Sequence, residues 1–188
     1  MSLTVKAADA AQLLSLVPRL LGFVPTQSVV LVPLAQGRSL GAMRVDLPPD
    51  DLIDTVAASA IGMVCRIADA DAVVAVVYTD AAISPRDTPP ALPHRALVDA
   101  IAARADACGL RMVDALTVAR DGWGSHDDPE LPAAGRSLDE LRVRDADARA
   151  LDADGQTDEP VGDQASGAAL PRVEPAARRA VSQAMRSL

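Results

Sequence analysis

The side chains best suited to chemistry in this sequence stand where the expected strands begin or end. If those strands lie in one sheet, these side chains share its carboxyl edge, which is where open α/β sheets bind ligands. The candidate ligand-binding residues at this edge are Thr26, Ser28, Asp46, Asp80, Asp121, Trp123, Ser125 and His126, together with Gln27 and Thr79. The same positions also suit solvated loop ends, where Asp and Ser cap backbone groups.

Three of these residues, Asp46, Asp80 and Asp121, define one specific hypothesis. Carboxylates at neighbouring strand ends can hold Mg²⁺, which would make the protein a small-molecule or phosphate-ester enzyme. This hypothesis requires the three carboxylates to converge, because ligands of one metal ion must lie close together.

Other reactive combinations in the sequence are weaker. His126 and the acidic residues of 127–130 include oxygen and imidazole donors, but their spacing matches no defined metal motif, and a solvated acidic turn is favoured. No Gly-rich phosphate loop follows a strand. No Ser-His-Asp pattern is legible, and the one combination left open is Ser28 or Ser125 with His126. Catalytic residues and cofactor are therefore left unassigned, and no metal site is predicted.

Cys65 and Cys108 lie far apart in the sequence, each on the apolar face of an expected helix. Because free Cys behaves as a small hydrophobe, we expect two buried thiols. Neither has a partner at ligand spacing, so no disulfide or metal pair is predicted.

Length and charge restrict the class of protein and its partners. With 188 residues the chain is long enough for one domain with its own core. The net charge of −8 argues against nucleic-acid binding, which needs clustered Lys and Arg. No apolar run approaches the roughly 18 residues of a membrane span, and the first residues do not resemble a signal peptide. We expect a cytoplasmic protein with no nucleic-acid or membrane partner; a small-molecule ligand, a protein partner and self-association stay open.

Hydrophobic patterning predicts an α/β fold built around two strands. The first is apolar throughout, as in a strand covered on both faces, whereas the second alternates. The expected elements are a helix at 7–21, strands at 28–34 and 40–47, a helix at 48–67, a strand at 72–78, a helix at 94–108 and a strand at 111–119. Strands separated by helices should be parallel, so we expect a single domain with a mixed sheet, in which an antiparallel hairpin feeds parallel strands, and helices on both faces.

The sequence becomes polar and rich in turn residues from Gly122 onward. Residues 137–140 have the form of a capping box, which predicts a short helix. Residues 145–167 contain few large apolar side chains, which favours mobility, and Pro175 opens a last helix. We therefore expect an α/β domain at 1–136 and a C-terminal extension at 137–188 that is partly mobile and ends in a helix.

Several motifs give the chain a family resemblance. They are LLGFVPTQS at 20–28, RVDLP at 44–48, the apolar strand that ends at Tyr78 and the weaker DGWGSH at 121–126. Over residues 7–136 the chain resembles the DUF4192 family, a bacterial domain of unknown function. The resemblance implies the α/β fold and a cytoplasmic location, and it implies no activity. Without a catalytic signature, the favoured function is a binding or interaction module, and the alternative is the enzyme built on the carboxylate cluster.

Overall fold

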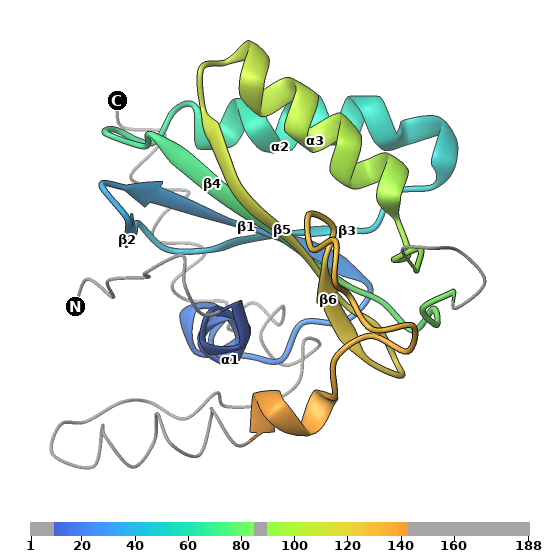
Figure 1. Ribbon diagram of the computed structural model, residues 1–188. Helices are drawn as coiled ribbons and strands as arrows, with labels where there is room; N and C mark the ends of the chain where they lie inside the picture. The colour runs from blue at the N-terminus through green and yellow to red at the C-terminus, as the bar shows by residue number, and fades with distance from the viewer. Residues whose placement is uncertain (1–9, 85–89, 143–188) are drawn as a thin grey trace, which may run out of the picture.

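The computed structural model describes residues 10–84 and 90–142. A central sheet carries helix α1 on one face and helices α2 and α3, side by side, on the other (Figure 1). The elements in chain order are α1 (Ala10–Leu21), β1 (Ser28–Ala35), β2 (Arg38–Ser39), β3 (Met43–Asp46), the 3₁₀ helix η1 (Asp50–Leu52), α2 (Ile53–Val64), β4 (Ala72–Tyr78), α3 (Arg95–Ala107), β5 (Arg111–Val118) and β6 (Trp123–Ser125). The expected single α/β domain with a mixed sheet is confirmed.

The six-stranded sheet has the order β2-β1-β4-β5-β6, and β3 also pairs with β1. β4 and β5 form the parallel pair, whereas β1 runs antiparallel to β2, β3 and β4. Every residue of β4 is buried, and so is every residue of β1 except the last. These strands are apolar on both faces because helices cover both sides of the sheet.

Two features of β1 fit its position between an edge and the sheet centre. Gln36 and Gly37 both have positive φ, which suits the tight two-residue turn into β2. Pro33 lies within the strand, and its carbonyl accepts a hydrogen bond from the Leu40 N–H on the outer side. In an antiparallel strand the N–H and C=O of one residue point the same way, so the donor that Pro33 lacks also faces outward. The ladder between β1 and β4 therefore loses no donor.

Two apolar cores lie on the two faces of the sheet. The core under α2 and α3 includes Leu31, Ile61 and Ile101, and the core under α1 includes Val17 and Leu116. The 3.6-residue spacing of apolar residues in 48–67 predicts a buried stripe that includes Leu52 and Met63. This prediction was partly wrong, since both side chains are exposed and Ile61 is buried instead. The physical reason is that residues 50–52 form a separate 3₁₀ turn, so the buried face of α2 starts later and consists of Ala57, Ala60, Ile61 and Val64.

The expectation of two buried cysteines was also wrong. Cys65 and Cys108 are free and exposed. Each is the residue that caps the C-terminal end of its helix, α2 or α3, rather than a member of the apolar helix face. At these ends the chain turns toward the next strand, so the two thiols lie outside the apolar core.

The segment after β5 contains one strand that the hydrophobic pattern did not predict. Strand β6 pairs antiparallel with β5 and brings Trp123 opposite Val118. The short helix expected from the capping box is present at 138–142, where the Ser137 hydroxyl accepts the Asp139 N–H at 3.2 Å. The expected mobile segment at 145–167 and the helix from Pro175 lie outside the described residues. Among the described helices, none has the length and apolarity needed to cross a bilayer.

Candidate functional site

A cavity of about 490 Å³ opens at the carboxyl edge of the sheet, on the α1 face. Its walls are α1, the segment leading into β1, the ends of β4 and β5, and the helical residues 138–142. Figure 1 shows α1 and the 138–142 helix below the same face of the sheet. The volume falls within the range of small-molecule sites, about 300–1,000 Å³. The apolar part of the lining consists of Leu14, Pro18, Val24, Pro25, Val118, Ala119, Leu138 and Leu141.

Tyr78, the last residue of β4, lines this cavity and is only 8% exposed. Its hydroxyl is buried and has no hydrogen-bond partner among the described residues. Burial raises the pKa of Tyr78 above its ordinary value, so the group stays protonated and able to donate. A buried hydroxyl without a partner costs about 1–3 kcal/mol, and native proteins rarely keep one without a reason.

The neighbouring strands place two more unsatisfied polar atoms on the same face of the sheet. Ser28 lies directly opposite both Tyr78 and Asp46, so these side chains share one face. In the described part of the chain, the Ser28 hydroxyl and the Arg44 Nε are buried without a hydrogen-bond partner. The Arg44 guanidinium forms an ion pair with Asp46 through Nη2, one of its two terminal nitrogens. Buried polar atoms without a hydrogen-bond partner among the described residues therefore lie on three neighbouring strands, at Tyr78 in the cavity wall and at Ser28 and Arg44 beside it.

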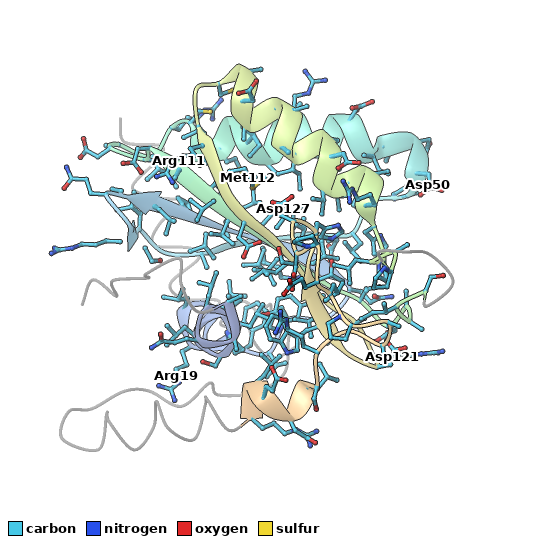
Figure 2. The ribbon with its side chains drawn as sticks, viewed as in Figure 1. Arg19, Asp50, Arg111, Met112, Asp121 and Asp127 are labelled. Carbon is cyan, nitrogen blue, oxygen red and sulfur yellow. The ribbon has the colours of Figure 1, made fainter. Side chains whose placement is uncertain are left out.

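The charged residues of the cavity lining are mostly basic. They are Arg19, Arg120 and Arg142, with Asp80 as the single acidic residue. Three positive charges minus one negative charge give the lining a formal +2, of which the Arg142 charge is shared with Asp139 in an exposed ion pair, whereas the whole chain carries −8. Figure 2 shows Arg19 projecting from α1 on the side away from the sheet. This local excess of positive charge favours an anionic group on any ligand.

Two of the predicted rim residues line the cavity, namely Thr26 and Asp80, and the neighbouring Gln27 and Thr79 do so as well. The Gln27 side-chain carbonyl accepts the backbone N–H of Asp80 at 3.0 Å. This bond ties the start of β1 to the end of β4, where the antiparallel register already brings them together. Ser28 and Asp46 lie on the adjoining strands, outside the lining.

Asp121 and Trp123 have structural contacts and do not line the cavity. The Asp121 carboxylate accepts the backbone N–H of Ile83 at 3.1 Å. The Trp123 ring is 4% exposed and packs in the core under α1, where its indole N–H donates to the Ser137 carbonyl at 3.1 Å. The guanidinium of Arg136 lies 5.7 Å from the centre of that ring. These contacts hold the segment after β5 against the sheet.

Ser125 and His126 line a second, smaller hollow of about 160 Å³ together with Arg95. The Ser125 hydroxyl donates to the Asp114 carboxylate at 2.6 Å, and His126 Nε2 bonds to the Thr117 hydroxyl at 2.8 Å. Serine and histidine are therefore held by different partners, and no Ser-His-Asp relay links them. Burial raises the pKa of Asp114, the only acidic residue of β5. The sequence analysis did not single out Asp114. The signal for it was an acidic residue inside an otherwise apolar strand.

The pKa of His126 gives a testable pH dependence. Burial, reinforced by Arg95, lowers this pKa to about 4, against the opposing effect of Asp99 and Asp127. Because the folded pKa lies below the unfolded value of about 6.5, the unfolded chain takes up this proton first as the pH falls. We expect the free energy of unfolding to drop by about 1–3 kcal/mol between pH 6.5 and pH 4 through this group alone, after discounting for its partial exposure.

Urea unfolding at several pH values would measure this effect, with His126→Gln as the comparison. The variant lacks the titrating imidazole, so its stability should fall less steeply over the same range. Equal slopes for the two proteins would show that His126 does not contribute.

The three carboxylates of the enzyme hypothesis are not gathered into a metal site in the described part of the chain. In residues 10–84 and 90–142, no three His, Cys, Asp or Glu side chains are grouped so that they could hold a metal ion. Asp46 is paired with Arg44, and Asp121 caps the backbone of Ile83 in the loop after β4. Asp121 also lies well apart from Asp127 (Figure 2). The convergence that the enzyme hypothesis requires is therefore not found among the described residues, where Asp46 and Asp121 each use the carboxylate in a local contact.

Residues 11–187 match the family described as Domain of unknown function (DUF4192). Neither the curated proteins nor the solved structures include a significant match to the chain. The matched range contains every residue that lines the 490 Å³ cavity. The chain therefore belongs to the DUF4192 family.

Proposed function

We propose that this protein is a binding module whose carboxyl-edge cavity takes a small anionic molecule with an apolar body. The observation that carries the proposal is the unpartnered hydroxyl of Tyr78, buried in the wall of a cavity of ligand size. A ligand acceptor atom at this hydroxyl would remove the cost of leaving it unsatisfied. The apolar lining accounts for the body of the ligand, and the arginines account for its charge.

Two features favour a small ligand over the other functions. The carboxylate cluster that an ester-cleaving enzyme would need is not assembled among the described residues. The large exposed apolar side chains, Val24, Leu40, Leu52 and Met63, come from four separate segments of the described chain. A protein-docking surface is typically a contiguous apolar patch, whereas the cavity is a concave one. We place the module in the bacterial cytoplasm, where the free thiols of both cysteines would stay reduced.

Medium-chain carboxylates are suitable first probes because they combine one anionic group with an apolar chain. We expect decanoate to raise the melting temperature saturably, and octylamine and octanol, which lack the anionic group, to raise it less. Calorimetric titration would give the dissociation constant. Trp123 is a poor reporter of this binding, because its ring is buried outside the cavity.

Arg120→Gln removes one positive charge from the lining and should weaken decanoate binding about 3–10-fold, as expected for a partly exposed charge pair. Arg66→Gln is the matched control, because Arg66 follows α2 near the opposite edge of the sheet. Equal losses in the two variants would indicate a general effect of net charge and would contradict the proposed site. A response of the melting temperature to octylamine but not to decanoate would overturn the anionic preference.

Tyr78→Phe separates the ligand's contribution from the stability of the fold. Without ligand, the variant should be as stable as the wild type or more stable by about 1–2 kcal/mol, because a buried unsatisfied hydroxyl has been removed. With decanoate, its affinity should fall about 5–20-fold through loss of one hydrogen bond. Chemical unfolding and calorimetric titration measure the two effects separately. Loss of stability in the free variant would mean that the hydroxyl already has a partner, against the proposal.

A further inference from the structure

The two cysteines lie at equivalent places in the fold. Cys65 directly follows α2 and Cys108 directly follows α3, and both are exposed. The two helices share one apolar core and run side by side across the same face of the sheet (Figure 1). Each helix leads into a strand of the parallel pair β4 and β5, so both C-terminal ends lie at the amino edge of these strands. Arg111 marks this edge in Figure 2, and Asp50 marks the opposite one.

Both residues cap the same end of the packed helix pair α2 and α3, and the Cys108 thiol is among the groups that act on the Cys65 thiol. They are the only cysteines in the sequence, and a bond between them would join positions 43 residues apart (108 minus 65). Neither thiol contributes to the apolar core, since both side chains have left the buried faces of their helices. Two exposed cysteines at the same end of two packed helices meet the first requirement for a disulfide, that the residues are neighbours in the fold. Bond formation further requires Cα atoms about 4.4–6.8 Å apart.

We propose that Cys65 and Cys108 form a redox modification site, closing into an intramolecular disulfide that ties α2 to α3 when a hydroperoxide is the oxidant. This inference is independent of the proposed ligand, because the pair lies at the edge of the sheet opposite the cavity.

The reaction balances with hydrogen peroxide as co-reactant. One thiolate attacks a peroxide oxygen, the O–O bond breaks, and a sulfenic acid forms with release of hydroxide, which takes up a proton to become water. The second thiol attacks the sulfenic sulfur, the S–S bond forms, and the hydroxyl leaves as a second water. The two sulfur atoms lose two electrons in total, and the peroxide gains them. Low-molecular-weight dithiols reverse the reaction by thiol–disulfide exchange.

The rate of closure should depend on pH. Desolvation and the nearby Cys108 thiol raise the pKa of Cys65, so only a small part of it is thiolate at neutral pH. The thiolate is the attacking species, so oxidation should become faster as the pH rises from 7 to 9. A slow reaction at neutral pH is expected of a site that responds to sustained rather than brief exposure to peroxide.

The full chain, treated with hydrogen peroxide and then freed of it, tests the proposal. We expect loss of both free thiols, a mass lower by about 2 Da from removal of two hydrogens, and no covalent dimer. The melting temperature should rise by about 5–10 °C, because the bond restricts a long loop in the unfolded chain, and fall back after treatment with dithiothreitol.

Cys65→Ser and Cys108→Ser are the matched controls, and both should fold because the replaced side chains are exposed. Neither should show the loss of 2 Da or the rise in melting temperature, and each should yield sulfenic or sulfinic acid or intermolecular dimers instead. Persistence of both thiols in the wild type under conditions that oxidise the single variants would overturn the proposal. Oxidation of the wild type only to covalent dimers would overturn it as well. Decanoate binding should be unchanged by closure, so failure of this proposal and failure of the cavity proposal are distinguishable.

Discussion

Leu31→Ala is expected to lower the free energy of unfolding by about 3–5 kcal/mol. Leu31 is fully buried near the middle of β1, where it lies opposite Met43 on one side and Ala75 on the other. β1 is hydrogen-bonded to neighbouring strands on both of its sides. Helices α2 and α3 cover the face of the sheet that carries Leu31. These elements have little freedom to collapse into the space, so the cost includes the cavity as well as the lost apolar burial.

Leu52→Ala is the matched control for this truncation. Leu52 belongs to the 3₁₀ helix η1 and is 45% exposed, so the same change should cost less than about 1 kcal/mol. Urea unfolding of both variants beside the wild type gives the two differences. A large loss at Leu52 would mean that this side chain is covered in solution, as it would be in a self-associated state, and sedimentation analysis of the wild type would then decide.

Gly122→Ala is expected to destabilise the protein by about 2–3 kcal/mol, because an added methyl group has no room. A Cβ at this position would stand 2.6 Å from the Ala134 carbonyl oxygen and 3.1 Å from that of Arg136. Both neighbours are backbone atoms, and Arg136 is held by two backbone hydrogen bonds to Trp123, of 3.0 and 2.7 Å. The segment must therefore move as a unit to accept the methyl group.

Gly62→Ala makes the same chemical change with the opposite expected sign. Gly62 lies inside α2, and a Cβ there would meet none of the described atoms within 4 Å. Alanine favours a helix interior over glycine, so this variant should gain about 0.5–1 kcal/mol. Thermal or urea unfolding of the two variants measures both effects. Destabilisation of similar size in the two would contradict the assignment of the loss at Gly122 to a backbone clash.

The segment that contains Gly122 also connects stability to the candidate site. Trp123, the next residue, donates its indole N–H to the Ser137 carbonyl, at the start of the helical residues 138–142. That helix supplies Leu138 and Leu141 to the lining of the cavity. Displacing the segment in Gly122→Ala should therefore weaken decanoate binding, whereas Gly62→Ala should leave it unchanged.

Much of the fold could be predicted from sequence because local patterning and burial agree in this chain. The continuous apolar runs at 28–34 and 72–78 are buried strands, and Met43 and Val45, the apolar side chains of the alternating strand, pack against the core under α2 and α3. Gly22 ends α1 with a φ of +79°, a backbone conformation that only glycine adopts at low cost. The order of helices and strands then determined the mixed sheet, through the rules for parallel crossovers.

The candidate site was less predictable, since its parts belong to segments that are distant in sequence. Sequence order places Thr26 and Asp80 at one edge, but it does not show that Asp121 caps a loop backbone or that Trp123 is buried. The short strand β6 was missed because Trp123–Ser125 has no periodicity of its own and is a strand only through pairing with β5.

The sequence by itself determined the class of fold, the central strands and the absence of any recognised catalytic motif, because these depend on local hydrophobicity and turn chemistry. Only the tertiary structure decided which polar groups are left without partners and which distant side chains meet. The buried, unpartnered hydroxyl of Tyr78 beside the cavity and the placement of Cys65 and Cys108 at the same end of two helices both arise from the pairing of strands and the packing of helices. Hydrogen-bond satisfaction and side-chain contact are properties of the packed chain, so no pattern along the sequence reveals them.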